Sequence, residues 1–342
     1  MRNYKGMNEM LLLPQGTDDL RMFAAIEDEL APSTRVAYEL QLRLLRSFYE
    51  SNGWSVFDAD PTEFVKHFLT YLSSLVEDGR SVSTLNKVVS ALRWEAGYTN
   101  PAYTGLLSAR PVKAFLAGVA RQHKSRQPRK AKSLTLSQLE SMQSHLNKQK
   151  SMAAIRNRAM LALGIATALR SSSLGELQLG DISRAVTMDG LIVSVRFSKT
   201  DQTGEGVDIP VKRSDNRLLD PVRAVDAWIG VLRAQGFSDP SMPLFPRIRG
   251  TRAITVAPIQ NPNMIITSLL RDLLVDVGIL TPVDAAGYSS HSLRATFITL
   301  SSQADVSEAS IAAVSGHKSM RVLRSYDRST VERHGQTDYL GG

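Results

Sequence analysis

The sequence predicts a mainly helical protein of two domains, with a small β-sheet in the C-terminal half. Three observations support this fold class. The chain has 342 residues, and a domain typically has about 150. Apolar residues recur at helical spacing over most of the chain, but a β-rich patch occupies 191–197 and 207–211, joined by the polar turn 198–206. A polar stretch at 122–134, with no apolar period and one proline, separates the two parts.

The N-terminal part is expected to be a short flexible tail, 1–16, followed by a helical domain, 17–121. Proline is tolerated in the first turn of a helix, and a side-chain oxygen of Ser33 or Thr34 can cap one. The expected helices are 18–30, a second from the Ser33 or Thr34 cap to about Asn52, a third from Pro61, then 81–96 and 111–121. In the third helix, the residues expected to face inward are Phe64, Phe68, Tyr71, Leu72 and Leu75.

The C-terminal part is expected to be one domain, 135–342, joined to the first by the basic linker 122–134. Its helices precede and follow the β-rich patch, which indicates a mixed domain with a small sheet. The expected helices are 135–147, 152–169, 219–235, 263–278, 291–303, 307–315 and 319–328.

The composition excludes several classes of protein. Because the chain contains no cysteine, it has no disulfide, zinc–thiolate site, iron–sulfur cluster or cysteine nucleophile. The longest nearly uncharged apolar run, 159–169, is far shorter than the ~20 residues that span a membrane. Residues 1–16 contain only a three-leucine patch, too little for a secretory signal. A soluble cytoplasmic protein is therefore expected.

Positive charge is concentrated in one stretch of the chain. The net charge is +8, and no acidic residue occurs between Glu95 and Glu140. That stretch contains Arg110, Lys113, Arg121, Lys124, Arg126, Arg129, Lys130 and Lys132. Such a segment attracts polyanions, of which nucleic acid is the commonest large one. The alternative is a solvated linker whose charge has no partner.

A set of basic and aromatic residues recurs in order along the C-terminal half. His291 and Arg294 lie three residues apart on an expected helix, but His-x-x-Lys/Arg also occurs at His123 and His145 and is weak alone. The other residues that occur in order with His291 and Arg294 make the pattern more specific. They are Arg170 upstream, Lys199 in the polar turn, Gly316-His317-Lys318-Ser319 downstream, and Tyr326 nine residues after His317. Over about 160–330 this order resembles the tyrosine recombinase (phage integrase) family, with a layout like its Cre-type members.

The resemblance implies a phosphoryl transfer that needs neither metal nor nucleotide, and no cofactor is expected. Arg170 and Arg294 would clamp the charge that grows on the phosphate oxygens in the transition state. Tyr326 would be the nucleophile. Its phenol, with an ordinary pKa of ~10, needs activation by a base and by nearby positive charge.

The remaining catalytic groups would donate hydrogen bonds or move protons. His291 and His317 can each hydrogen-bond the phosphate or transfer a proton near neutral pH. Lys199 can protonate the departing 5′-oxygen. The chain departs from the family pattern at Ser173, where an acidic residue usually supports the active-site histidine, and Glu176 is the nearest acid that could take over this role. Tyr288 and Tyr339 are rival nucleophiles.

Two groups of residues are expected to contact DNA. Basic side chains of the linker region would bind phosphates without reading sequence: Arg121, Lys124, Arg126, Arg129, Lys130 and Lys132. Lys87, Ser90 and Arg93 recur three apart on the helix 81–96 and could face a major groove.

Taken together, these residues predict a site-specific DNA recombinase that cuts and rejoins strands through a 3′-phosphotyrosine intermediate. The two domains would clamp double-stranded DNA in a C shape, as a homotetramer on two inverted-repeat sites and as a monomer or dimer when free. It would act in the cytoplasm at the nucleoid and contact no membrane. The alternatives are a type IB topoisomerase-like strand relaxase and a non-catalytic DNA-binding regulator.

Overall fold

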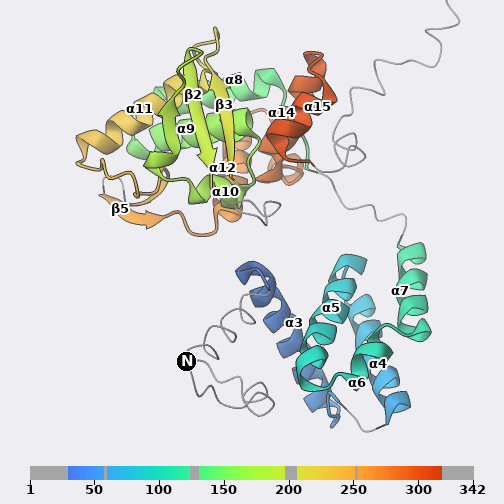
Figure 1. Cartoon of the computed structure of the whole chain (residues 1–342). Coiled ribbons are helices and arrows are strands. Elements are labelled where there is room, and N and C mark those ends of the chain that lie inside the picture. The colour runs from blue at the N-terminus through green and yellow to red at the C-terminus, as the bar shows by residue number, and fades with distance from the viewer. Residues whose placement is uncertain (1–29, 58–59, 124–130, 197–205, 251–252, 318–342) are drawn as a thin grey trace, which may run out of the picture. The chain divides into compact units, whose positions relative to one another are not determined.

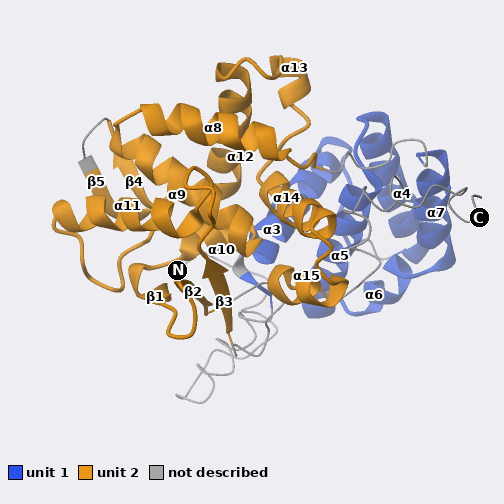
Figure 2. Cartoon of the chain, turned by 90° about the horizontal axis from the view of Figure 1, so that it is seen from above, with its two compact units in different colours: residues 1–128 blue, residues 129–342 orange. Residues whose placement is uncertain are grey.

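The chain folds into two compact units, Met1–Pro128 and Arg129–Gly342, shown in separate colours in Figure 2. The computed structural model describes residues 30–57, 60–123, 131–196, 206–250 and 253–317 (Figure 1). In these residues helices predominate and two small antiparallel sheets occur, which confirms the predicted fold class. The expected helix 319–328 and nearly all of the helix 18–30 and the turn 198–206 lie outside the described residues. No helix in the described ranges is long and apolar enough to cross a membrane.

The first unit is a bundle of helices around an aromatic and aliphatic core. Its helices are α3 (Pro32–Ser51), α4 (Pro61–Glu77), α5 (Val82–Thr99), α6 (Ala102–Leu107) and α7 (Arg110–Gln122). The inward face predicted for α4 is confirmed, since the buried residues of this helix are Phe64, Phe68, Tyr71, Leu72 and Leu75. Asp60 and Ser81 cap α4 and α5, because their side chains accept backbone N–H bonds of the first turn.

Two details of the first unit differ from the sequence-based prediction. The helix α3 has no side-chain cap at Ser33 or Thr34. It begins at Pro32, and its N-cap is Ala31, two residues before the earlier of the two expected caps. Proline at the first position needs no hydrogen bond for its nitrogen and has its φ already fixed, which replaces the cap. The helix α6 was not predicted, because six residues are too few to show a helical period.

The second unit combines helices with two small sheets. Its helices are α8 (Leu136–Lys148), α9 (Met152–Thr167), α10 (Ser171–Glu176), α11 (Pro221–Ala234), α12 (Pro262–Asp276), α13 (Pro282–Ala285), α14 (His291–Gln303) and α15 (Glu308–Ser315). The strands β1 (Ile182–Arg184), β2 (Gly190–Val195) and β3 (Val207–Lys212) form one antiparallel sheet in the order β1-β2-β3. The strands β4 (Pro246–Arg249) and β5 (Ala253–Pro258) form a second antiparallel sheet. Only β2 and β3 were predicted.

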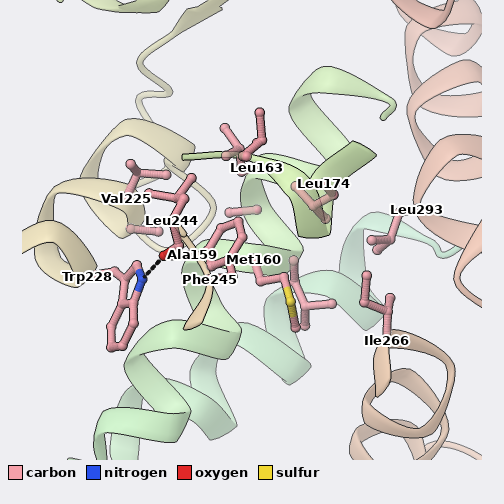
Figure 3. Close-up of a cluster of buried hydrophobic side chains, with 14 of the residues drawn as sticks. Ala159, Met160, Leu163, Leu174, Val225, Trp228, Leu244, Phe245, Ile266 and Leu293 are labelled. Carbon is pink, nitrogen blue, oxygen red and sulfur yellow. Dashed lines mark hydrogen bonds between the residues drawn. The ribbon is translucent and has the colours of Figure 1, made fainter. Parts of the chain in front are cut away.

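The helix α9 is the centre of the second unit. It contacts α8, α10, α11, α14 and β3, and Ala159, Met160 and Leu163 are buried in the core drawn in Figure 3. Trp228 of α11 is fully buried beside them, and its Nε1–H donates to the Leu244 carbonyl at 2.7 Å. Because α9 is packed on so many sides, the chain that leaves its C-terminal end has a fixed position.

The last residues of the expected linker belong to the second unit. The Lys132 N–H donates to the Gly287 carbonyl at 3.2 Å. Leu134 is buried, and its N–H donates to the Thr296 hydroxyl of α14 at 2.8 Å. The expectation of a linker up to residue 134 is therefore wrong at this end, because backbone hydrogen bonds and one buried leucine hold 131–134 against the fold.

The contact between α10 and α12 leaves no room for a side chain at Gly175. A Cβ at this position would lie 2.4 Å from Cγ of Pro262, and a proline ring cannot rotate away. We therefore expect Gly175→Ala to lower the free energy of unfolding by about 1–3 kcal/mol, the usual cost of overpacking. Urea unfolding of the purified protein measures this change.

The matched control is Gly230→Ala on α11, where a Cβ meets nothing within 4 Å. There the better helix propensity of alanine is expected to raise stability by up to about 1 kcal/mol. Equal effects of the two substitutions would contradict the close packing of α10 on α12.

Candidate active site

Arg170 stands at a sharp change of chain direction after α9. The helix ends at Thr167, and Ala168 adopts the left-handed conformation with φ +51°, which is uncommon for a residue with a Cβ. Arg170 then takes the N-cap position of α10. The turn therefore places the half-buried Arg170 just after the C-terminal end of α9.

Arg294 is buried, only 6% exposed, in the first turns of α14. Its Nη1 donates to the Ala168 carbonyl at 3.1 Å. A buried guanidinium needs hydrogen-bond acceptors, because leaving its donors unpaired away from water is costly. The strained turn after α9 supplies one of them, so the same turn positions both arginines.

His317 lies against Arg294, just after α15. Gly316 ends this helix with φ +64°, a conformation that glycine adopts at no steric cost. The Nη2 atom of Arg294 is 3.3 Å from Nδ1 of His317 and 3.4 Å from Nε2. The Ser315 hydroxyl also contacts this ring, 2.8 Å from Nδ1.

The electrostatics of the two histidines show that four of the predicted residues share one site. Burial, then the charge of Arg294, then that of Arg170 lower the pKa of His317 from its ordinary 6.5 to about 4. The same three causes, in the same order, lower the pKa of His291, the first residue of α14. Both imidazoles are therefore neutral at pH 7.

This arrangement is suited to bind an anion whose charge increases during a reaction. Two guanidinium groups supply permanent positive charge, and neutral imidazoles can accept or donate a proton without adding repulsion. Among the described residues, no group of three or more histidine, aspartate or glutamate side chains could hold a metal ion.

Glu176 is not joined to the histidines in the part of the chain that the structure describes. It is an exposed residue at the end of α10, and no hydrogen bond or ion pair links it to His291. Desolvation raises the pKa of its carboxyl. Ser173, the position at which the family usually has an acid, is buried. A supporting role of Glu176 stays a prediction.

Two predicted catalytic residues, Lys199 and Tyr326, lie outside the described residues and stay predictions, as does the rival Tyr339. The other rival, Tyr288, is only 6% exposed and belongs to the core. Its hydroxyl is 3.4 Å from the Gln138 amide nitrogen, and its carbonyl accepts from Nε of Arg271. These contacts give Tyr288 a structural role.

The residues predicted to contact bases lie on one helix of the first unit. Lys87 and Arg93 are exposed on α5 and Ser90 is partly exposed. The Ser90 hydroxyl donates to the Asn86 carbonyl at 2.9 Å, and Nη2 of Arg93 donates to the Leu107 carbonyl at 3.3 Å. Contact with DNA remains a prediction for all three.

Of the residues predicted to bind phosphates, two lie in described parts of the chain. Arg121 is exposed on the last turn of α7. Lys132 is part of the second unit instead of a free linker, since its stem packs on Gly287 and its Nζ lies 5.9 Å from the Tyr288 ring centroid. The other four, Lys124, Arg126, Arg129 and Lys130, lie outside the described residues.

Two members of the site were missed by the sequence analysis. The Ala168 carbonyl reaches Arg294 because Ala168 adopts the left-handed conformation. The sequence around it, 167–170, contains no glycine or asparagine that would predict this conformation. Ser315 contacts His317 from two residues upstream. A lone serine at the end of a helix gives no sequence signal.

The buried Arg294, the charge of Arg170 acting on the same imidazoles and the neutral histidines form a site suited to an anion, carried by a mainly helical fold of two units. Residues 132–333 match the model of the Phage integrase family. The chain therefore belongs to this family, and it is a tyrosine-type site-specific recombinase.

Similar proteins agree with this assignment. The chain is 26% identical over 308 residues to the integrase/recombinase xerD homolog of Selenomonas ruminantium, covering 88% of this chain and 83% of the relative. Its fold is similar to that of XerH site-specific recombinase bound to palindromic difH substrate in a post-cleavage complex (TM-score 0.57, 13% identity, 89% of this chain and 79% of that one). It is also similar to that of a lambda integrase tetramer bound to a Holliday junction (TM-score 0.52, 15% identity, 91% and 77%).

The effect of the Arg170 charge on the pKa values of His291 and His317 can be tested by substitution. Because this charge disfavours the imidazolium form, we expect Arg170→Gln to raise the pKa of both His291 and His317. That of His317 should move from about 4 toward 6.5 but stay below it, since burial is the larger cause. An NMR titration of the histidine rings measures both values.

The control is Arg233→Gln, which removes an exposed charge from the last turn of α11. It should leave both pKa values unchanged. A shift of the same size in the control, or none with Arg170→Gln, would show that Arg170 does not share the site.

Proposed function

We propose that this recombinase cuts and rejoins DNA strands through a 3′-phosphotyrosine intermediate. The observation that carries the proposal is the joint position of Arg294, His317 and the Ala168 carbonyl, with the charge of Arg170 acting on the same imidazole. A scissile phosphate placed there meets two guanidinium donors. These stabilise the charge that grows on its non-bridging oxygens in the transition state.

The chemistry then needs a nucleophile and an acid. The Tyr326 oxygen forms a bond to phosphorus while the bond from phosphorus to the 5′-oxygen breaks. The phenolic proton passes to a neighbouring base, and Lys199 supplies the proton that the 5′-oxygen takes up. The phosphotyrosine bond keeps the energy of the broken phosphodiester, so a 5′-hydroxyl from another strand can reverse the step and complete strand exchange.

The assembly proposed is a tetramer on two inverted-repeat sites. Similar folds support this: XerH is bound to a palindromic substrate after cleavage, and lambda integrase is a tetramer on a Holliday junction. Two-fold symmetry of the protein would be mirrored in the DNA site.

DNA binding is proposed to be divided between two kinds of contact. Lys87, Ser90 and Arg93 on α5 would read base edges from a rigid helix. The basic residues around the linker would bind phosphates: Arg121, Lys124, Arg126, Arg129 and Lys130. Lys132 is held against Tyr288 and is proposed to contact phosphate from the surface of the second unit.

The nucleophile is tested by Tyr326→Phe. This protein should bind its DNA site with unchanged affinity and form no covalent adduct, because only the attacking oxygen is removed. A nicked suicide substrate, from which the cleaved fragment diffuses away, traps the adduct of the parent protein, and peptide mapping identifies the modified residue.

The matched control is Tyr288→Phe, which removes a tyrosine hydroxyl that contacts Gln138 in the core. This variant should still form the adduct. An adduct that persists in Tyr326→Phe, or that maps to Tyr288 or Tyr339, would overturn the assignment.

The linker contacts are tested by the salt dependence of binding. Each phosphate contact contributes about 0.9 to the slope of log K against log[salt]. Replacing Lys124, Arg126 and Arg129 by glutamine should therefore flatten the slope by ~2–3 units and leave the preferred sequence unchanged.

A triple variant with the same change of charge, at the exposed Lys148, Lys150 and Arg233 of the second unit, serves as the control and should flatten the slope less. A changed sequence preference with an unchanged slope would mean that the linker reads bases.

A further inference from the structure

The segment that leads into α14 is held by one face of α12. Arg271 donates from Nε to the Tyr288 carbonyl at 2.8 Å and from Nη2 to the Ala286 carbonyl at 3.0 Å. One turn earlier on α12, the Thr267 hydroxyl accepts the N–H of Ser290 at 2.9 Å. Because these contacts bind backbone groups, they fix the path of the chain just before α14.

A third residue extends this face toward the start of α12. Asn263, Thr267 and Arg271 are four residues apart, so they lie on one side of the helix; these three residues form the polar face of α12. The Ser290 hydroxyl donates to Oδ1 of Asn263 at 2.6 Å. Ser290 is the residue before α14, where a serine hydroxyl usually caps the helix that follows. Here it binds a neighbouring helix, so α12 holds Ser290 through both its backbone and its side chain.

Ser290 also joins α12 to the turn that carries Arg170. Its Oγ is 3.3 Å from Oγ of Ser171, the residue after Arg170, and Ser290 is only 4% exposed. The close packing of Gly175 on Pro262 holds α10 against the start of the same helix. The residue after Arg170 and the residue before α14 are thus both held at the first turns of α12.

We propose that the polar face of α12 is a positioning element for catalysis, which holds the residues before α14 so that His291 keeps a fixed distance from Arg170. The consequence for strand cleavage rests on the proposed function. A phosphate can contact both side chains only when their separation matches its size, and a misplacement of about 1 Å can reduce the rate of a reaction about 100-fold.

The first measurement compares two variants of Thr267 in the free protein. Thr267→Ser keeps an oxygen that accepts the Ser290 N–H, whereas Thr267→Val has nearly the shape of threonine but no hydroxyl. Burial, then Arg294, then Arg170 lower the pKa of His291. The effects of burial and of Arg170 weaken if His291 moves away from Arg170. We therefore expect a higher His291 pKa in Thr267→Val than in Thr267→Ser, measured by NMR titration of the histidine rings.

His317 is the reference in the same spectra. It follows α15 and lies outside the segment that the polar face holds, so its pKa of about 4 should be the same in both variants. The variant His317→Gln identifies its signals. An equal rise at both histidines would mean general loosening of the site, and an unchanged His291 would mean that Thr267 does not position it. Either result would overturn the proposal.

The second measurement is cleavage of the nicked suicide substrate under single-turnover conditions. At saturating DNA, Thr267→Val should cleave roughly 10–100-fold more slowly than Thr267→Ser, the cost of a small displacement of a catalytic group. The affinity for DNA should be equal in the two variants, because the substitution changes the placement of His291 and not the binding surface. Equal cleavage rates would show that the polar face has no part in catalysis.

Asn263 provides an independent variant, which keeps the test valid if Thr267→Val unfolds. Asn263 is exposed in the first turn of α12, so Asn263→Ala removes the acceptor of the Ser290 hydroxyl without opening the core. This variant should have a higher His291 pKa and slower cleavage, at a similar melting temperature and DNA affinity. The matched control is Ser268→Ala, at an exposed position of the same helix outside the polar face. Changes of the same size in the control would contradict the proposal.

The two proposals fail in different ways. If the wild type forms no adduct on the suicide substrate, the proposed function is wrong, but the histidine titration of the free protein still tests the polar face of α12. If the wild type forms the adduct and the two Thr267 variants behave alike, only the inference about the polar face is wrong.

Discussion

The hydrogen bond from the buried Arg294 to the Ala168 carbonyl is the contact on which the active site depends. It joins the first turns of α14 to the end of α9, two segments that are 126 residues apart in the sequence. A guanidinium placed in this interior without an acceptor would be strongly destabilising, because its donors would lose water and gain nothing. Because Arg294 is buried, its guanidinium must lie within reach of an acceptor such as the Ala168 carbonyl. This contact also determines the position of His291, which lies on the same face of α14 as Arg294. It determines the position of Arg170 as well, because Arg170 is two residues after Ala168 in the same turn.

The same burial that fixes the arginines also determines the protonation of the histidines. Arg294 and Arg170 both lower the pKa of His291 and of His317, and desolvation acts in the same direction. The free site thus holds its positive charge on groups that never lose it, and keeps the imidazoles neutral. A bound phosphate opposes the effect of the arginines, because its negative charge favours the imidazolium form. With such an anion bound, both histidines would therefore accept a proton more readily than in the free protein.

The sequence analysis succeeded where local signals and packing agree. The inward face of α4 was correct residue by residue, because apolar spacing and the N-terminal proline both indicate the same helix. The motif residues Arg170, His291, Arg294 and His317 were identified from their order, and the structure brings them together. What the sequence did not show are features made by tertiary contact: the left-handed Ala168, the short helix α6, the strands β1, β4 and β5, and the docking of 131–134. Most of these segments are too short to show a period. The turn residues Gly250, between β4 and β5, and Asp189-Gly190, at the turn from β1 into β2, were present in the sequence but were not used.

The docking of Leu134 has a consequence for the exchange of its amide hydrogen with solvent. Its N–H is held by the Thr296 hydroxyl, and that hydroxyl donates to the Ser292 carbonyl at 2.7 Å. Ser292 is the neighbour of His291 on α14. Because Leu134 is buried, its amide hydrogen can exchange with water only when residues 131–134 separate from α14. The exchange rate of this one amide therefore reports how firmly the start of the second unit is held against α14.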